Sequence, residues 1–387
     1  MSVSWRVQRA WPCSCTSQRV DVTRLLLCTS AGLAIFVHAA NTAARQKPVF
    51  ETRSVSRQER ADAIGRAGVW RAPRVPIASV RLTGELKGPS HLDCRFLVAP
   101  LGGTTPKFDC LLASGKKLRT KYGHVPEIPA EVAATRLLSA LGFGADQVTL
   151  VERIRCYGCP LDPFRTTKVV DTTHTQSQYE RSINYQRFTD FDWVAVEERL
   201  AARPIEAEGH EGWAFFELDR VNSALGGAPR AHVDALRLLA VFLAHWDNKA
   251  ENQRLVCLSP TWTKGKPCPE PFLMLQDLGA TFGPRKVDLD GWQRAMIWKD
   301  RQTCTVSMAD LPHGGGTFAE TRISERGRQF LAELLSQLTD GQVEGLFSAA
   351  KFDKQSGLLS TAAPVSEWVR VFKRRVRELS DGPACPS

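Results

Sequence analysis

The sequence has no internal repeat, no low-complexity tract and no run of about 20 strongly apolar residues. Without a period of roughly 20 to 50 residues, repeat architectures are excluded. Hydrophobic residues make up 43% and charged residues 24% of the chain, which is an ordinary globular balance and excludes disorder throughout. With 387 residues, and about 150 residues in a typical domain, the chain can form two or three structural units around a sizeable core.

Excess positive charge is concentrated near the N-terminus. The net charge is +10, and the first 60 residues hold nine Lys/Arg and three Asp/Glu, so the remaining body is nearly balanced. The one basic cluster in the body lies within residues 368–379, where apolar residues recur every three or four positions. This pattern predicts an amphipathic helix with a solvated basic side, and no nucleic-acid partner is expected.

The N-terminal region has the pattern of a targeting segment. Leu25–Val37 is an apolar run of 13 residues that follows two arginines and precedes small residues. That length is typical of a signal-peptide core and is short for a membrane span. The prediction is therefore a signal peptide over residues 1–40 and an exported protein, either periplasmic, lumenal or extracellular. The alternative is a retained membrane anchor over residues 25–44, which would be the chain's only contact with a membrane.

The cysteine content also favours an oxidising compartment. Removal of the leader leaves eight of the eleven cysteines, an even number that suits disulfide bonds. We expect Cys257 to pair with Cys268, and Cys156 to pair with Cys159. The Cys156–Cys159 motif is also compatible with a redox pair or half of a zinc site, but no second CxxC or matching His pair accompanies it.

After a polar linker over residues 41–75, the chain is predicted to form a sheet-rich unit. Strands are expected at 94–100, 107–113 and 116–122, followed by a helix at 131–141. The loop between the first two strands contains Gly102, Gly103, Thr104 and Thr105.

This order of elements suits phosphate binding. Backbone N–H groups of a glycine loop can approach phosphates closely, and a lysine on the third strand can reach them if a helix carboxylate holds it. Lys117, Arg119 and Lys121 share one face of that strand, and we select Lys121 because it lies just before the helix. Glu131 is the expected partner. Glu127 is the competitor, but a proline two residues later places it outside the expected helix.

A second constellation follows a long helix predicted at 230–244. The motif HWDNKAEN begins at residue 245 and contains Asp247, Lys249 and Asn252. An aspartate there can accept a hydroxyl proton, a lysine can neutralise a transferring phosphoryl group, and an asparagine oxygen can ligate Mg²⁺.

The chain beyond this motif is expected to supply a second metal ligand. Strands at 254–258 and 272–276 are predicted to pair, and the second ends in Asp277, two residues before a glycine. A carboxylate at that position can hold a metal ion against the β- and γ-phosphates. Two scaffold helices are expected within 324–350, the second capped by Thr339.

These motifs resemble those of kinases. HWDNKAEN matches the HRDLKPEN catalytic loop at five of eight positions, and Asp277-Leu278-Gly279 resembles DFG. Residues 131–143 are similar to the regulatory-helix segment of secretory-pathway Golgi casein kinases, and HipA-type and CotH-type kinases share this reduced plan. The resemblance covers about residues 90–350.

The resemblance implies an α+β, two-lobed kinase-like fold, with an N-lobe over 76–160 and a C-lobe over 161–380. It also implies binding of ATP with Mg²⁺ or Mn²⁺. Gly102 to Thr105 would contact the nucleotide. Lys121 would bind phosphate, and Glu131 would hold Lys121 in place. Asp247 would be the catalytic aspartate with Lys249 beside it, and Asn252 and Asp277 would be the metal ligands.

The expected function is that of an exported atypical kinase. It would transfer the γ-phosphoryl group of ATP to a hydroxyl, either on Ser/Thr of exported proteins or on a glycan or small molecule. The alternative is a catalytically inactive pseudokinase or binding module of the same fold. Trp246 stands where the kinase motif has arginine, so control through an activation-loop phosphate is not expected.

Overall fold

A computed structural model describes residues 54–82, 90–198, 200, 202–263, 266–312, 315–354 and 362–386. The predicted signal peptide and its anchor alternative lie outside these residues. Within them, no helix is both long and apolar enough to cross a membrane.

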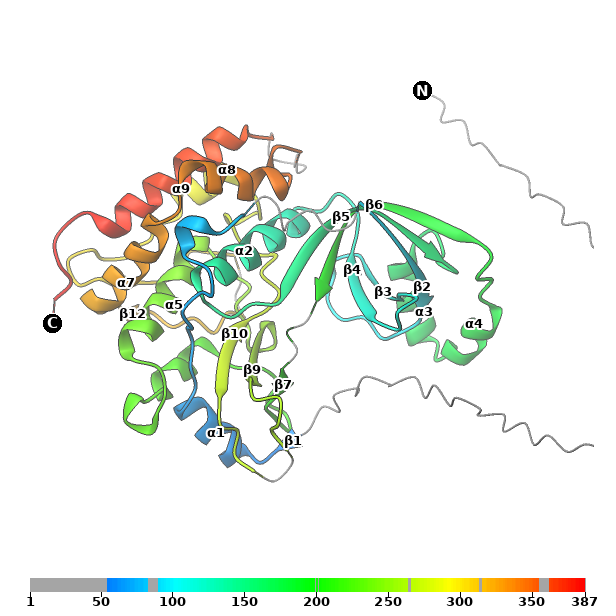
Figure 1. Ribbon diagram of the computed structural model, residues 1–387, viewed down its shortest axis with the longest axis horizontal. Coiled ribbons are helices and arrows are strands. Elements are labelled where there is room, and N and C mark those ends of the chain that lie inside the picture. Colours follow the sequence, from blue (N-terminus) through cyan, green and yellow to red (C-terminus); the bar gives the residue numbers. More distant parts are fainter. Residues whose placement is uncertain are drawn as a thin grey trace, which may run out of the picture. The chain divides into compact units, whose positions relative to one another are not determined.

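The described part of the chain mixes strands and helices, which confirms the predicted α+β class (Figure 1). The strands are β1 (Ser54–Val55), β2 (His91–Leu97), β3 (Lys107–Leu111), β4 (Lys117–Lys121), β5 (Gln147–Tyr157), β6 (Phe188–Glu198), β7 (Arg203–Pro204), β8 (Glu206–Ala207), β9 (Gln253–Cys257), β10 (Pro271–Leu275), β11 (Thr305–Val306) and β12 (Thr321–Arg322).

Helices occupy much of the rest of the described chain. The α-helices are α1 (Arg57–Gly65), α2 (Glu127–Leu141), α3 (Pro163–Thr172), α4 (Gln176–Ser182), α5 (Arg230–Leu243), α6 (Leu289–Arg294), α7 (Glu325–Ser336), α8 (Asp340–Ala349) and α9 (Val365–Ser380). Short 3₁₀ helices are η1 (Ile77–Ser79), η2 (Phe215–Arg220), η3 (Ser223–Leu225), η4 (Ala250–Asn252) and η5 (Phe352–Lys354).

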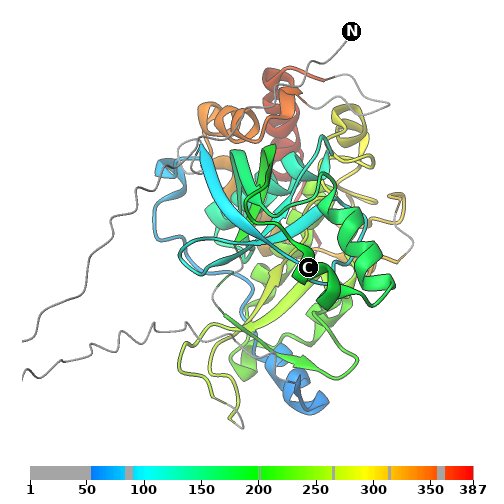
Figure 2. The same cartoon turned by 90° about the vertical axis from the view of Figure 1, so that its right-hand side faces the viewer.

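Five strands form a sheet that closes on itself in the order β2-β3-β4-β6-β5. Strand β2 pairs parallel with β5, and the other neighbours are antiparallel. The first three strands lie within a few residues of their predicted positions. Strand β6 extends the sheet to residue 198. The predicted boundary between the two lobes, at residue 160, therefore lies within the span of this sheet. Helices α3 and α4 lie beside this sheet (Figures 1 and 2).

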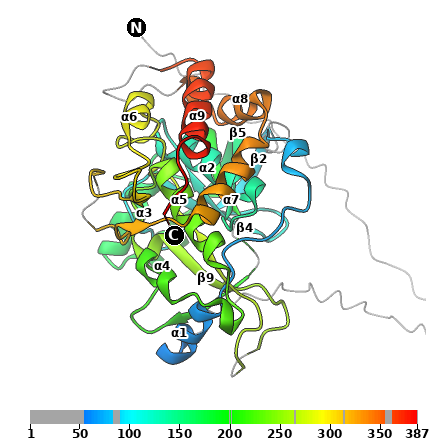
Figure 3. The same ribbon diagram turned by 90° about the vertical axis from the view of Figure 1, so that its left-hand side faces the viewer.

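Three apolar clusters stabilise the described part of the chain, and the two larger ones are separate from each other. One fills the closed sheet and contains Phe96, Phe108, Ile154 and Val194, all almost fully buried. The larger cluster includes the apolar residues of α2, α5, α7, α8 and α9. Helix α9 runs alongside α7 and α8 (Figure 3), as their contacts also show. Helix α2 therefore belongs to the core of the helical elements although it follows the third strand of the sheet.

The sequence pattern predicts that the basic side of α9 is solvated, but one arginine of this helix is buried. Arg375 is fully buried and donates to the carbonyl groups of Phe242, Trp292 and Ala295. These carbonyls lie at the C-terminal ends of α5 and α6, where helix carbonyls lack intrahelical partners and the helix dipole favours a cation. Burial lowers the pKa of Arg375 to about 9. The periodicity found the helix correctly but could not reveal that this arginine satisfies buried carbonyl groups.

The segment predicted as a linker over residues 41–75 is structured from residue 54 onward. Helix α1 begins with a capping box between Ser56 and Glu59. Arg60 is buried, and its guanidinium group donates to both carboxylate oxygens of Glu217 at 2.8 Å. Isolated bridges then join Gly68 to Phe272 and residue 70 to residue 143. The linker prediction is thus wrong for this part because a short polar helix docks through a small buried face.

Four disulfide bonds join the eight cysteines of the described chain. The two predicted pairs, Cys257–Cys268 and Cys156–Cys159, are both present. The others are Cys94–Cys110 and Cys304–Cys385. Because disulfides persist in oxidising environments, these bonds favour an exported compartment.

The pair in the CxxC motif is enclosed by the core of the closed sheet. Cys156 is 0% and Cys159 is 9% exposed. Their bond removes the thiolates that zinc binding needs, and their burial denies access to a redox partner. The structure therefore favours a structural disulfide over the two alternatives for this motif, a redox pair and half of a zinc site.

Candidate active site

Lys121 lies at the centre of a three-residue ion-pair cluster. Its Nζ is 2.8 Å from Oε1 of Glu131 and 3.0 Å from Oδ1 of Asp277. These residues come from β4, from α2 and from the loop that follows β10, so three distant segments meet at one ammonium group. The side chains of Lys121 and Glu131 are 5% and 3% exposed, whereas that of Asp277 is 43% exposed. The cluster is therefore closed on the helix side and open at Asp277.

Lys121 and Asp277 stabilise each other's charge, whereas burial raises the pKa of Glu131 to about 7 despite the neighbouring Lys121. Burial works against the charge of Lys121, but the carboxylates of Glu131 and Asp277 outweigh it and raise the pKa of Lys121 above its ordinary value. For Asp277, loss of solvent raises the pKa, but Lys121, followed by Lys107 and Lys249, lowers it below the ordinary value. The Asp277 carboxylate thus stays ionised beside three lysines.

The structure also distinguishes the three basic residues of β4. Lys117 and Arg119 both pair with Asp109 on the neighbouring strand, at 2.8 Å and 2.9 Å respectively. Only Lys121, at the end of the strand, reaches α2. The preference for Lys121 among the three therefore agrees with the geometry.

The expectation for Glu127 is wrong, because this residue lies in the first turn of α2. Proline is tolerated in the first turn, where its missing N–H has no intrahelical partner, so the proline at 129 does not exclude Glu127 from the helix. Glu127 accepts a hydrogen bond from the Thr105 hydroxyl at 2.6 Å, and its other carboxylate oxygen pairs with Lys286. It thereby links the glycine loop to the segment beyond Asp277, while Glu131 holds Lys121.

The glycine loop lies directly over a second lysine. Gly103 has a φ of +69°, which favours glycine, and a Cβ there would lie 3.3 Å from the Nζ of Lys107. Lys107 begins β3 and faces Lys121 in the register of the β3–β4 pair. It is 9% exposed, and no group among the described residues forms an ion pair or hydrogen bond with its ammonium group.

Burial and the neighbouring Lys121 lower the pKa of Lys107, and Asp277 opposes that shift. A buried, unpaired cation is costly unless an anion joins it. Sequence reasoning missed Lys107. Its position in the sequence could have indicated it, because Lys107 begins an apolar strand immediately after the glycine loop and lies opposite Lys121 in the predicted hairpin.

The HWDNKAEN motif follows α5, which was predicted at nearly its observed bounds. Ala244 ends that helix in the left-handed conformation, with a φ of 53°. The Asn252 side-chain nitrogen then donates to the Asp247 carbonyl at 2.7 Å, and Lys249 Nζ lies 3.6 Å from Asp247 Oδ1. These contacts fold the motif into a loop in which Asp247 is partly exposed.

Two residues of this motif that were given no chemical role hold the loop in place. Asn248 Oδ1 accepts from the backbone N–H groups of Thr317 and Phe318 at 2.7 Å and 2.9 Å, so it ties the loop to a segment about 70 residues away. His245 is fully buried, and burial lowers its pKa to about 4. A histidine that stays neutral and buried suits a structural role.

Strands β9 and β10 bring the two expected metal ligands together. They pair antiparallel, as predicted, and the backbone N–H of Gln276 donates to the Asn252 carbonyl at 2.9 Å. Asn252 and Asp277 therefore lie at the same end of the hairpin. Asp277 has a φ of 49°, a conformation that non-glycine residues adopt mainly where the surroundings enforce it.

The ligand set fits a metal ion that binds together with phosphate. No group of three or more His, Cys, Asp or Glu side chains in the described part of the chain could hold a metal ion by itself. Mg²⁺ typically uses one or two protein oxygens together with water and substrate phosphates. One half-exposed carboxylate and one amide beside an unpaired lysine suit that arrangement better than a permanent metal site.

Comparisons with known proteins add little to this geometry. No protein-family model matches the chain, and no curated protein matches it. A search of solved structures finds a proinflammatory kinase of Helicobacter pylori, CtkA, at 9% sequence identity and a TM-score of 0.39. The match covers 75% of this chain and 95% of that one. At such a low TM-score, the similarity establishes neither a shared fold nor a shared activity.

Proposed function

We propose that this protein is an exported, kinase-like phosphotransferase that binds ATP with Mg²⁺ or Mn²⁺ and phosphorylates a hydroxyl group. The observation that carries the proposal is the cluster of Lys121, Glu131 and Asp277 beside the unpaired Lys107. A lysine held by a helix carboxylate, next to a glycine loop and a metal-binding aspartate, is the arrangement that protein kinases use for ATP phosphates. The proposed two-lobed architecture is supported by the separate apolar cores of the closed sheet and of the helical elements.

In this proposal the two lysines bind the nucleotide phosphates. Lys121 is already oriented by Glu131 and contributes a fixed positive charge. Lys107 lacks an anionic partner, so a phosphate oxygen would provide the one that its burial requires. The backbone of Gly102 to Thr105 covers the phosphates, since the absence of a side chain at Gly103 leaves room above Lys107.

Asp277 and Asn252 are the residues that would hold the metal ion. The ion that they would hold, Mg²⁺ or Mn²⁺, would supply positive charge that offsets the charge developing on the transferring phosphoryl group. Asp277 is suited to this role because its carboxylate is held ionised by the lysines and remains accessible.

Asp247 orients the acceptor hydroxyl and takes its proton. The hydroxyl oxygen bonds to the γ-phosphorus, the bond between that phosphorus and the β,γ-bridging oxygen breaks, and ADP leaves with the bond's electron pair. Lys249, near the Asp247 carboxylate, contributes positive charge on the side of the transferring group. The acceptor is a hydroxyl of an exported protein, a glycan or a small molecule.

The test is transfer of labelled γ-phosphate together with calorimetric binding of ATP and Mn²⁺. Asp277→Asn keeps the size of the side chain and suits the left-handed backbone, which asparagine tolerates well. Asp290→Asn, an exposed residue on α6, is the matched control. We expect Asp277→Asn to reduce turnover by at least about 100-fold, as for loss of a key electrostatic group, and the control to behave like the unaltered chain.

Three results would contradict this proposal. Equal turnover by Asp277→Asn and the unaltered chain would remove Asp277 from the reaction. Metal-dependent ATP binding without transfer to any tested hydroxyl would favour the alternative of a pseudokinase. Labelling from the α-phosphate instead of the γ-phosphate would point to adenylylation.

A further inference from the structure

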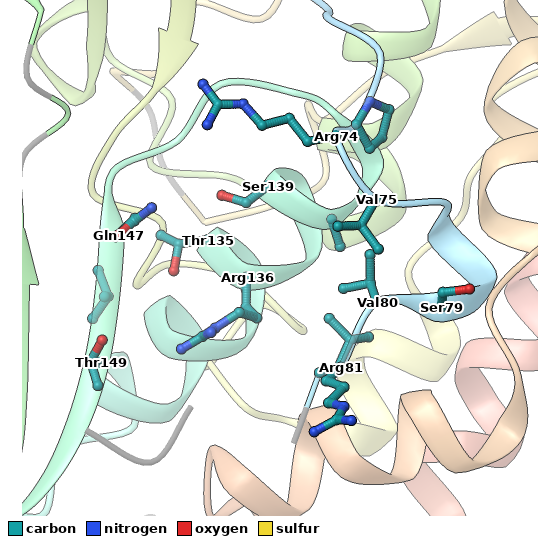
Figure 4. A pocket seen from close by; sticks show the side chains of 14 residues that line it. Arg74, Val75, Ser79, Val80, Arg81, Thr135, Arg136, Ser139, Gln147 and Thr149 are labelled. Carbon is teal, nitrogen blue, oxygen red and sulfur yellow. The ribbon is translucent and has the colours of Figure 1, made fainter. Parts of the chain in front are cut away.

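A cavity of about 620 Å³ lies against α2, on the helix face that also carries Thr135 (Figure 4). Its walls come from three segments: residues 73–82, the C-terminal half of α2 and the start of β5 at 147–149. The volume lies within the range of roughly 300 to 1,000 Å³ that is typical of small-molecule sites. Neither the sequence motifs nor the proposed phosphotransfer assigns it a role.

The wall formed by residues 73–82 is fixed at both ends. At one end, the Trp70 indole donates to the Leu141 carbonyl at 2.7 Å, and Arg71 N–H donates to the Gly142 carbonyl at 2.9 Å. At the other end, the Gln342 side-chain amide donates to two backbone carbonyls, at positions 77 and 80, both at 2.8 Å. These bonds hold the segment away from α2 at a defined spacing, so the cavity is built into the fold.

The lining combines cations, hydrogen-bond donors and apolar side chains. Arginines stand at positions 74, 81 and 136, and none of the described lining residues is acidic. Figure 4 shows Arg81 and Arg136 at one end of the cavity and Arg74 at the other. Hydroxyl groups of Ser139 and Thr149 and the apolar side chains of valines complete the walls.

We propose that this cavity binds a small organic anion, specifically a phosphate monoester with an apolar body. Guanidinium groups pair with phosphate through two parallel hydrogen bonds, and hydroxyl donors add further contacts. The valines suit the apolar remainder of such a ligand. The inference goes beyond phosphotransfer and stands without it.

A ligand here would touch the helix that carries Glu131. The Thr135 hydroxyl donates to the Glu131 carbonyl at 2.7 Å, one turn before it on α2. The cavity and the Lys121 cluster therefore share a single helix, although they use different side chains of it.

Calorimetry of the full chain with phenyl phosphate, in the absence of divalent metal and nucleotide, tests the proposal. We expect saturable binding that weakens at least 10-fold in Arg74→Ala/Arg81→Ala. Both arginines are exposed, so the double variant retains its fold, which a thermal melt verifies. Arg57→Ala, an exposed arginine on α1, is the matched control and should bind like the unaltered chain.

A second variant separates the cavity from the proposed nucleotide site. Lys107→Met removes a phosphate-binding group of that site and should leave phenyl phosphate binding unchanged. Loss of binding in Lys107→Met, or undiminished binding in Arg74→Ala/Arg81→Ala, would overturn the proposal, as would no binding by the unaltered chain. Ser139→Trp, which fills the cavity from an exposed position on α2, should block binding and provides an independent check.

Discussion

Lys107→Met should affect stability and nucleotide affinity in opposite directions. In the ligand-free protein Lys107 is 9% exposed and faces Lys121 across a strand pair, and its ammonium group has no ion-pair or hydrogen-bond partner among the described residues. The Cβ atoms of facing residues in an antiparallel pair are about 5 Å apart. Two like charges separated by about 5 to 10 Å repel by about 1.5 to 3 kcal/mol at an effective dielectric constant of 20. Asp277 offsets part of this repulsion. Methionine keeps the length of the side chain and removes the charge, so we expect the free energy of unfolding to rise by about 1 to 3 kcal/mol.

The same substitution should weaken ATP binding. A hydrogen bond to a charged group contributes about 1.5 to 3 kcal/mol, so losing the contact between Lys107 and a phosphate corresponds to a roughly 10- to 100-fold higher dissociation constant. Chemical denaturation without nucleotide and calorimetry with ATP and Mn²⁺ measure the two effects. Lys116→Met, which removes only an exposed ion pair with Glu198, is the matched control and should change neither quantity appreciably.

The pH dependence provides a further check on the stability effect. Because the folded-state pKa of Lys107 lies below its ordinary value of 10.5, the unfolded chain binds its proton more tightly than the folded chain. The cost of the buried charge is therefore complete at neutral pH and is relieved as the pH rises towards 10.5. The stability difference between Lys107→Met and the unaltered chain should shrink over that range. A destabilised variant, or one with unchanged ATP affinity, would refute the reasoning.

Three other predictions concern the scaffold. The folded-state pKa of His245 is about 4 and its ordinary value is 6.5, so about 3 kcal/mol of stability should be lost as the pH falls from 6.5 to 4. His245→Gln should flatten this dependence of stability on pH. An equally steep dependence in the variant would contradict the role of His245 in it. Arg60→Met should cost about 3 kcal/mol in urea denaturation, the lower end of the range for breaking a buried ion pair, since it leaves the buried Glu217 carboxylate with only the more distant Arg220 at 3.6 Å and the Ala214 N–H; a cost below about 1 kcal/mol would show that α1 contributes little. Replacing both Cys257 and Cys268 by serine should cost about 3 kcal/mol, the chain-entropy value for a loop closed over 11 residues, and an unchanged melting temperature would argue against the bond.

Local patterns were sufficient for most secondary structure. The 3.6-residue periodicity located α5, the capping pattern at Thr339 located the start of α8, and the glycine loop located the β2–β3 hairpin. Each of these signals depends on neighbours within a few residues, which the sequence displays directly. The same local rule misjudged Glu127, because it treated the proline at 129 as a boundary and did not allow for its acceptance in the first helical turn.

Local patterns failed where burial depends on a distant segment. Helix α1 reads as a polar linker, and its place in the core depends on Glu217, 157 residues away from Arg60. Arg375 reads as a solvated residue of an amphipathic helix, yet it satisfies carbonyls at the ends of α5 and α6. A charged residue gives the same local signal whether it faces water or a buried partner.

The sequence by itself determined which residue types can carry the proposed chemistry, their order along the chain and the elements on which they stand. Only the tertiary structure decided that Lys121 contacts both Glu131, ten residues away, and Asp277, 156 residues away. It also revealed Lys107 as a buried cation without a partner in the described chain. The physical reason is that the free energy of a charge depends on its solvent exposure and on the charges within a few ångströms, and folding sets both of these over distances that no local pattern records.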